Sequence, residues 1–117
     1  MHFTIYHNPR CRKSREALQY LEEKKVEIEV VKYLDLPIDQ KTLEEVLTKI
    51  GLKPSEIVRK NEPLWKKQYA TQKLTEDQIL ALLIEHPKLI ERPIVTTSNS
   101  GVMARPLESL IEFMQLG

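Results

Sequence analysis

The 117-residue sequence contains a single cysteine, Cys11. One cysteine cannot form a disulfide within the chain, and it cannot supply a metal site built from several cysteines. The sequence also has no apolar stretch near twenty residues and no recognisable signal peptide. We therefore expect no membrane partner, no bound metal or cofactor, and a cytoplasmic location in which the thiol stays reduced.

An excess of charge of either sign is also missing. The chain has 18 basic and 17 acidic residues and a net charge of +1, which makes nonspecific nucleic-acid binding a poor prediction. With 41% hydrophobic and 30% charged residues, the composition is that of a folded protein. The length favours one domain over residues 1–117 with its own core, and no repeat or linker interrupts it.

The ten residues from Tyr6 to Arg15 surround the cysteine and carry most of the chemistry. They follow a short apolar run, residues 3–6, that predicts a strand. They precede apolar residues at helical spacing, namely Ala17, Leu18 and Leu21. Cys11 is therefore expected in the turn between a strand and a helix, where free N–H groups and the helix dipole favour an anion.

Four cations lie within four residues of the sulfur: Arg10, Arg12, Lys13 and Arg15. A lone cysteine is often an inert, buried apolar residue. Charged neighbours in a loop instead favour the thiolate, so the sequence predicts a nucleophile beside an anion-binding loop.

The chain after the first helix alternates between strand and helix patterns. Residues 26–31 predict a second strand, and residues 92–97 and 102–104 predict two strands joined by a hairpin at 98–101. Between them, helix start signals at Asp39 and Thr75 and a helix end at Gly51 indicate a helical segment. A final helix follows Arg105-Pro106.

The order β-α-β, then helices, then β-β-α predicts an α/β fold. It is the pattern of a thioredoxin-like mixed sheet with a helical lobe inserted at about residues 39–87. In that fold the proline before the third strand lies near the cysteine. We therefore expect the Arg92-Pro93 peptide bond to be cis, as about 5% of X-Pro bonds are.

Three arginines outside the cysteine loop fall at element boundaries: Arg59, Arg92 and Arg105. Arg92 and Arg105 each precede a proline, which restricts the backbone of the preceding residue. A planar guanidinium on a fixed backbone suits forked binding of a tetrahedral oxyanion. Isolated arginines are more often solvated surface charges, and the sequence alone does not show that these three converge.

With these residues in order, the sequence resembles the glutaredoxin-linked arsenate reductase family. The resemblance covers nearly the whole chain, and its most specific part is Tyr6-His7-Asn8-Pro9 followed by Cys11 and Ser14-Arg15. It implies reduction of arsenate to arsenite, with glutathione as co-substrate and glutaredoxin as protein partner. We expect the protein to be a monomer. The sequence ends at Gly117, without the longer C-terminal tail of some members, and Arg10 and Arg12 are more basic than the smaller residues often found at those positions.

The resemblance also implies residue roles. Cys11 corresponds to the nucleophile, His7 to the active-loop histidine and Arg15 to the arginine that closes the loop. The oxyanion-binding arginines correspond to Arg59, Arg92 and Arg105. His7 would stabilise the thiolate or move a proton, or else serve only as a hydrogen-bonded structural residue of the turn.

Three other interpretations stay open at the level of sequence. One is a glutathione-dependent thiol oxidoreductase that does not act on arsenate. Another is an Spx-type regulator that binds RNA polymerase, although many of those carry a second cysteine where this chain has Ser14. The third is a monothiol glutaredoxin that bridges an iron–sulfur cluster, which the His-Asn-Pro loop and the helical insertion fit poorly.

Overall fold

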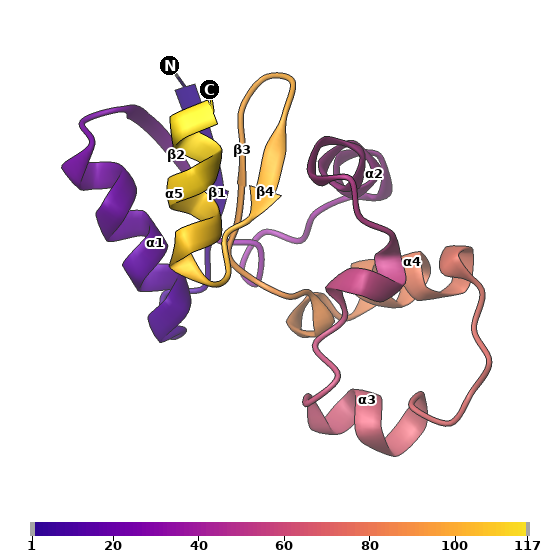
Figure 1. The fold of residues 1–117 in the computed structure, drawn as a ribbon. Coiled ribbons are helices and arrows are strands. Elements are labelled where there is room, and N and C mark those ends of the chain that lie inside the picture. The colour runs from indigo at the N-terminus through magenta and orange to yellow at the C-terminus, as the bar shows by residue number, and fades with distance from the viewer. Residues whose placement is uncertain (1, 117) are drawn as a thin grey trace. The chain divides into compact units, whose positions relative to one another are not determined.

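The computed structural model describes residues 2–116. It contains two compact units (Figure 1). One unit holds the residues up to Leu36 together with those from Arg92 onward, and the other is Pro37–Glu91. The second unit covers the expected insertion at about 39–87, while the prediction of a single domain stays a prediction.

The first unit is built on a four-stranded mixed sheet with the strand order β2-β1-β3-β4. β1 (His2–Tyr6) pairs in parallel with β2 (Glu27–Val31), and the connection between them is helical. β1 also pairs antiparallel with β3 (Ile94–Thr96), which pairs antiparallel with β4 (Gly101–Met103). This topology confirms the predicted α/β fold of the thioredoxin-like pattern.

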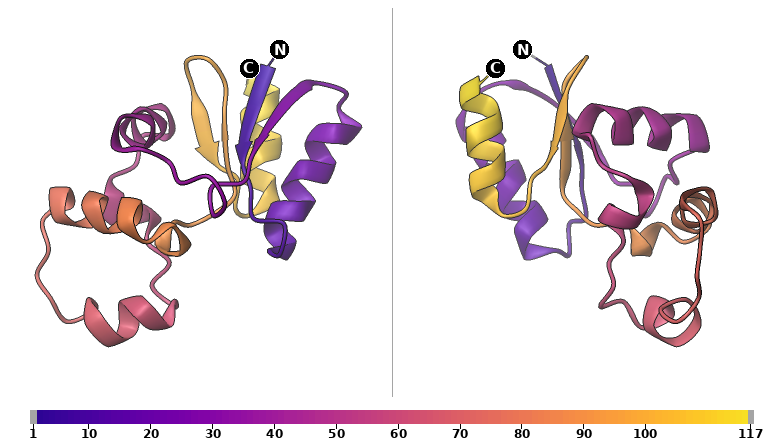
Figure 2. Two further views of the ribbon diagram at one scale, coloured as in Figure 1. Left: turned by 180° about the vertical axis from the view of Figure 1, so that it is seen from behind. Right: turned by 45° about the vertical axis from the view of Figure 1, so that its right-hand side comes forward.

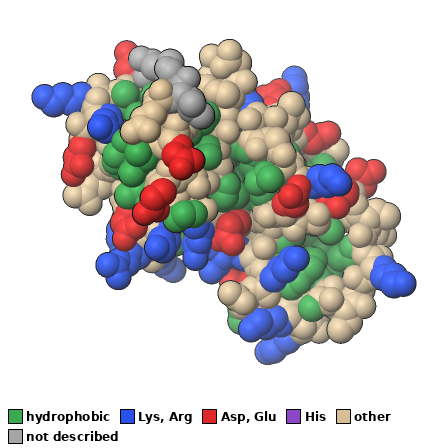
Figure 3. Space-filling view, viewed as in Figure 1, with side chains coloured by type: hydrophobic (Ala, Val, Ile, Leu, Met, Phe, Trp, Pro, Cys, Tyr) green, Lys and Arg blue, Asp and Glu red, His purple; other side chains and the backbone are tan. Residues whose placement is uncertain are grey.

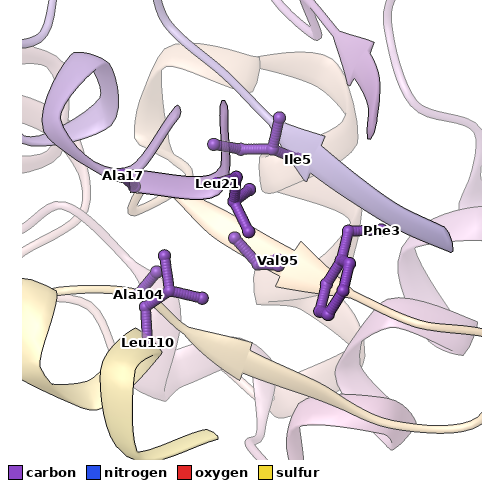
Figure 4. Packing of buried hydrophobic residues seen from close by; sticks show 7 residues of the cluster. All are labelled: Phe3, Ile5, Ala17, Leu21, Val95, Ala104 and Leu110. Carbon is purple, nitrogen blue, oxygen red and sulfur yellow. The ribbon is translucent and has the colours of Figure 1, made fainter. Parts of the chain in front are cut away.

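Two helices of this unit cover one face of the sheet. α1 (Arg12–Glu23) and α5 (Leu107–Leu116) contact each other and lie on the same side of the strands (Figure 2). Between helices and sheet lies a cluster of apolar side chains (Figure 4). Its fully buried members are Phe3, Ile5, Ala17, Leu21, Val95, Ala104 and Leu110.

The turn between β3 and β4 is closed by hydrogen bonds between Thr97 and Ser100. The Thr97 amide donates to the Ser100 carbonyl at 2.8 Å, and the two hydroxyl oxygens lie 2.8 Å apart. The hairpin predicted at 98–101 is therefore confirmed.

The second unit consists of short helices. In chain order they are α2 (Gln40–Ile50), the 3-10 turn η1 (Pro54–Ile57), α3 (Pro63–Gln68), α4 (Glu76–Glu85) and the 3-10 turn η2 (Pro87–Leu89). α4 contacts α2, η1 and η2. An antiparallel bridge between Val58 and Ile90 joins the chain after η1 to the chain after η2.

Local sequence signals set both ends of α2 and the start of α4 as predicted. The Asp39 carboxylate accepts a hydrogen bond from the Thr42 amide at 2.8 Å and begins α2, and Gly51 ends it with φ +70°. Thr75 and Gln78 cap the start of α4 reciprocally, with N···O distances of 2.8 and 3.2 Å. Each side chain or glycine here satisfies or ends backbone groups that a helix terminus leaves unpaired.

The buried face of α4 differs from the prediction. The spacing predicts Ile79, Leu82 and Leu83 on the inner face, but the structure buries Leu80 with Ile79 and Leu83 and leaves Leu82 half-buried. α4 packs against three elements, so its apolar surface is wider than one stripe. Within residues 2–116, every helix is too short or too polar to cross a lipid bilayer.

Candidate active site

The register of the sheet brings the predicted site segments of the first unit to one edge. Tyr6 at the end of β1 is aligned with Val31 and with Ile94, the first residue of β3. One step further out, the His7 amide donates to the Val31 carbonyl at 2.8 Å. The cysteine loop therefore leaves the sheet where β3 enters it.

The same edge also receives the two Arg-Pro segments. Ile94 is aligned with Met103, and the Ala104 amide donates to the Pro93 carbonyl at 2.9 Å. Arg92-Pro93 thus precedes β3 and Arg105-Pro106 follows β4 at the edge where β1 ends. Long-range strand pairing therefore brings together segments about ninety residues apart in the chain.

Both Arg-Pro peptide bonds are cis. The bond between Arg92 and Pro93 was predicted, and the structure confirms it. The bond between Arg105 and Pro106 was not, because nothing in the sequence separates it from an ordinary trans X-Pro bond. Arg92 is buried, with 8% of its surface exposed, whereas Arg105 is exposed.

Cys11 is the N-cap residue of α1 and is 9% exposed. Its backbone is extended, and its carbonyl accepts the Arg15 amide at 3.0 Å as the helix begins. The thiol makes no capping hydrogen bond to the helix amides. As the N-cap residue, Cys11 lies at the positive end of the α1 dipole.

The loop before Cys11 is held by its own hydrogen bonds. The Cys11 amide donates to the Asn8 carbonyl at 3.0 Å, and the Asn8 side-chain oxygen accepts the Arg10 amide at 3.0 Å. The Arg15 guanidinium donates to the Pro9 carbonyl at 2.9 Å. These contacts fix the path of the backbone from the end of β1 to the start of α1.

His7 is buried, with 4% of its surface exposed, and its Nδ1 lies 2.6 Å from the Ser14 hydroxyl oxygen. Burial lowers the pKa of His7 below its ordinary value of 6.5. The positive charges of Lys32 and then Arg15 lower this pKa further. This lowered pKa favours the neutral ring at pH 7.

The contacts of Ser14 in this site were not predicted from the sequence. Ser14 is completely buried in the first turn of α1, and its hydroxyl also accepts the Asn8 amide at 3.0 Å. A small hydroxyl residue three positions after the cysteine was the only signal available. That signal indicated the absence of a second thiol but not the presence of a bond to His7.

Cationic side chains surround the start of α1. Arg10, Arg12, Lys13 and Arg15 are all exposed, and lysine and arginine side chains gather at the end of this unit where α1 begins (Figure 3). Arg12 forms an i,i+4 ion pair with Glu16 at 3.3 Å. The loop is therefore a basic surface around one thiol, which suits an anionic reaction partner.

Arg59 belongs to the second unit, and its contacts there are well defined. A guanidinium nitrogen lies 3.3 Å from a Glu62 carboxylate oxygen and donates to the Lys88 carbonyl at 3.5 Å. The other Glu62 oxygen lies 3.9 Å from the Lys88 ammonium. The structure therefore brings five of the six predicted residues to one unit, and the role of Arg59 with them stays a prediction.

Residues that could hold a metal ion do not gather anywhere in the described chain: no group of three or more His, Cys, Asp and Glu side chains occurs among residues 2–116. The chemistry that the site can supply is that of one thiol, one neutral imidazole and several guanidinium groups. This combination on a thioredoxin-like sheet defines a monothiol protein of the thioredoxin-like class.

Known proteins resemble the chain over nearly its full length. Residues 6–113 match the ArsC family. The chain is 42% identical over 108 residues to an arsenate reductase of Neisseria meningitidis serogroup A, covering 91% of this chain and 92% of the relative. It is also 42% identical over 112 residues to YfgD, an uncharacterized protein of Escherichia coli strain K12, covering 94% of each chain.

Solved structures show the same relationship. An arsenate reductase from Vibrio cholerae superposes with a TM-score of 0.89 at 38% identity, covering 96% of this chain and 97% of the other. The chain belongs to the ArsC family.

Proposed function

We propose that this protein reduces arsenate to arsenite, with glutathione as co-substrate and glutaredoxin as the protein that completes the reaction. The observation that carries the proposal is Cys11 at the N-terminus of α1, on the sheet edge that also holds Arg92 and Arg105. Family membership supports it, because relatives at 34–42% identity are named arsenate reductases.

The first step is attack of the Cys11 thiolate on arsenic. A sulfur–arsenic bond forms, and one arsenate oxygen leaves as water after protonation. Arg59, Arg92 and Arg105 would bind the remaining oxygens, because guanidinium groups form paired, charge-assisted hydrogen bonds with tetrahedral oxyanions. The free amides at the start of α1 would add to this charge stabilisation.

The two electrons that take arsenic from +5 to +3 come from two thiols outside the chain. Glutathione adds to the arsenic of the Cys11 adduct, and a second water leaves. A glutaredoxin thiolate then attacks the glutathione sulfur, which forms a mixed disulfide and returns the sulfur–arsenic electron pair to arsenic. Hydrolysis of the remaining sulfur–arsenic bond releases arsenite and restores the Cys11 thiol.

His7 and Arg15 would act beside this chemistry. A neutral imidazole can donate one hydrogen bond to the thiolate or carry the proton of a departing oxygen. The Arg15 contact with Pro9 would hold the loop in the shape that presents Cys11. We further propose that the protein is a cytoplasmic monomer that acts without a resident cofactor.

The experiment is NADPH oxidation in a mixture of purified protein, glutathione, glutathione reductase, glutaredoxin and arsenate. We expect arsenate-dependent turnover that Cys11→Ser abolishes. Arg92→Ala should reduce kcat by about 100-fold, as loss of one preorganised charge-stabilising donor does. Lys67→Ala, an exposed change in α3, is the matched control and should leave the rate unchanged.

Two outcomes would replace the proposal. Turnover of a glutathionylated substrate through Cys11, without turnover of arsenate, would identify a glutathione-dependent thiol oxidoreductase. Inactivity toward both substrates, with specific retention of RNA polymerase by the immobilised protein, would identify a regulator.

A further inference from the structure

Ser14 has the surroundings of an internal anchor. Its side chain is completely buried in the first turn of α1. Within residues 2–116 its hydroxyl makes two hydrogen bonds, with His7 Nδ1 at 2.6 Å and with the Asn8 amide at 3.0 Å. His7 and Asn8 are consecutive residues of the loop after β1, and Ser14 lies in α1, so one oxygen atom joins this loop to the helix.

The direction of each bond follows from the atoms available. An amide nitrogen can only donate, so the Ser14 oxygen accepts from Asn8. The Ser14 hydroxyl proton then needs an acceptor, because a buried donor without a partner is costly. Among the described residues His7 Nδ1 is the acceptor in reach, and an acceptor nitrogen carries no proton.

We infer that Ser14 is a positioning residue that fixes the tautomer of His7. Its hydroxyl donates to Nδ1 and thereby holds the ring proton on Nε2. The same hydroxyl anchors the Asn8 peptide, whose carbonyl accepts the Cys11 amide at 3.0 Å. One buried oxygen thus sets both the donor atom of His7 and the backbone that carries the thiol.

The charged groups that act on His7 agree with a neutral ring. Lys32, after β2, and Arg15, on α1, disfavour the protonated form, while Glu22 on α1 and a hydrogen bond with the Ser14 backbone oppose them with smaller effects. A neutral ring has a single proton to place, so the partner of Nδ1 decides where it lies. The catalytic consequence of this placement rests on the proposed function, whereas the tautomer itself does not.

The direct test is the nitrogen-15 spectrum of the histidine side chains in the full chain at neutral pH. His2→Gln and His86→Gln variants assign the other two rings. We expect the His7 signals of a ring protonated on Nε2 and bare at Nδ1. A wild-type ring protonated on Nδ1 would overturn the inference without any variant at the site.

Ser14→Ala then separates positioning from simple packing. We expect His7 to become a mixture of tautomers, seen as convergence of its two nitrogen shifts. We also expect the rate of Cys11 alkylation to fall roughly threefold to tenfold, as loss of one buried hydrogen bond predicts. Ser14→Cys, kept reduced because it places a second thiol three residues after Cys11, has a similar size and a weak donor. It should retain part of the Nε2 tautomer even if the alanine variant folds poorly.

Thr48→Ala is the matched control, because it removes another helical hydroxyl that donates to a backbone carbonyl at 3.0 Å in the other unit. It should leave the His7 signals unchanged. An unchanged tautomer in folded Ser14→Ala contradicts the inference. If the wild type shows the expected tautomer but does not turn over arsenate, the proposed function is contradicted and the inference about His7 is not.

Discussion

The Arg15 guanidinium donates a 2.9 Å hydrogen bond to the carbonyl of Pro9. The two residues lie at opposite ends of the cysteine turn, so the contact closes the turn around Cys11 from its solvent side. An exposed arginine that bonds to a backbone carbonyl contributes little to folding, but it restricts the loop that carries Cys11.

Arg15→Gln should therefore affect turnover more than stability. We expect kcat to fall by roughly 10-fold, because small displacements of a reacting group are costly to catalysis. The free energy of unfolding should change by less than about 1 kcal/mol. Arsenate-dependent NADPH oxidation and urea unfolding measure the two effects. Wild-type turnover in the variant would show that the Arg15–Pro9 contact does not position Cys11.

The Glu62 carboxylate lies 3.3 Å from the Arg59 guanidinium that is proposed to bind arsenate. An oxyanion bound there would share the guanidinium with Glu62 or displace it. Glu62→Gln should lower the KM for arsenate about twofold to fivefold, the range of a partly exposed ion pair, while Arg59→Ala should raise it. Glu45→Gln on α2 is the control. An unchanged KM in both Arg59 and Glu62 variants would remove Arg59 from the binding site.

The lowered pKa of His7 makes stability depend on pH. Below about pH 6.5 the unfolded chain binds more protons at His7 than the folded chain does. The contribution of His7 to the free energy of unfolding therefore decreases as the pH falls. Above that range this contribution does not change with pH. From about pH 7.5 down to about pH 5, the free energy of unfolding measured in urea should therefore fall more for the wild type than for His7→Gln. Equal losses would mean that His7 titrates normally.

The charge of Lys32 contributes to the same shift, and its removal should be visible in the ring itself. Lys32→Gln should raise the pKa of His7, because one of the positive charges that disfavour the imidazolium is gone. A proton NMR titration of the His7 ring measures this. Lys67→Gln, in the other unit, should leave the titration unchanged, and a pKa of His7 that does not move in Lys32→Gln would contradict the assignment of the cause.

Burial decides the cost of losing a leucine. Leu21 on α1 is fully buried in the core of the sheet unit, whereas Leu36 is 72% exposed. Leu21→Ala should lower the free energy of unfolding by about 2–5 kcal/mol, and Leu36→Ala by less than about 0.5 kcal/mol. Urea unfolding compares them. Similar losses in the two variants would contradict the packing of α1 against the sheet.

Much of this fold could be predicted because its signals are local. The caps at Asp39, Thr75 and Gly51 depend on neighbours within four residues, and the structure has them as expected. The alternation of strand and helix patterns sufficed for the class of fold. What escaped prediction depends on tertiary contacts: Leu80 is buried because α4 packs against several elements, which no single helical stripe indicates.

The candidate site also combines features that the sequence predicts with features that depend on tertiary contacts. Cys11 and its cationic neighbours are contiguous in sequence, so their association was visible. The bond between His7 and Ser14 joins residues seven positions apart across a turn, and it depends on side-chain directions that spacing does not reveal. The roles of Arg59, Arg92 and Arg105 come from the resemblance and stay predictions.

The division of the chain into two units has a consequence for how new substrates could arise. Cys11, its loop, Arg92 and Arg105 belong to the unit outside Pro37–Glu91, and Arg59 is the one proposed site residue within that segment. If Arg59 binds the oxyanion as proposed, substitutions around Arg59 and Glu62 would change anion preference without altering the contacts that hold Cys11. Laboratory selection for a different oxyanion should accumulate its first changes within the insertion.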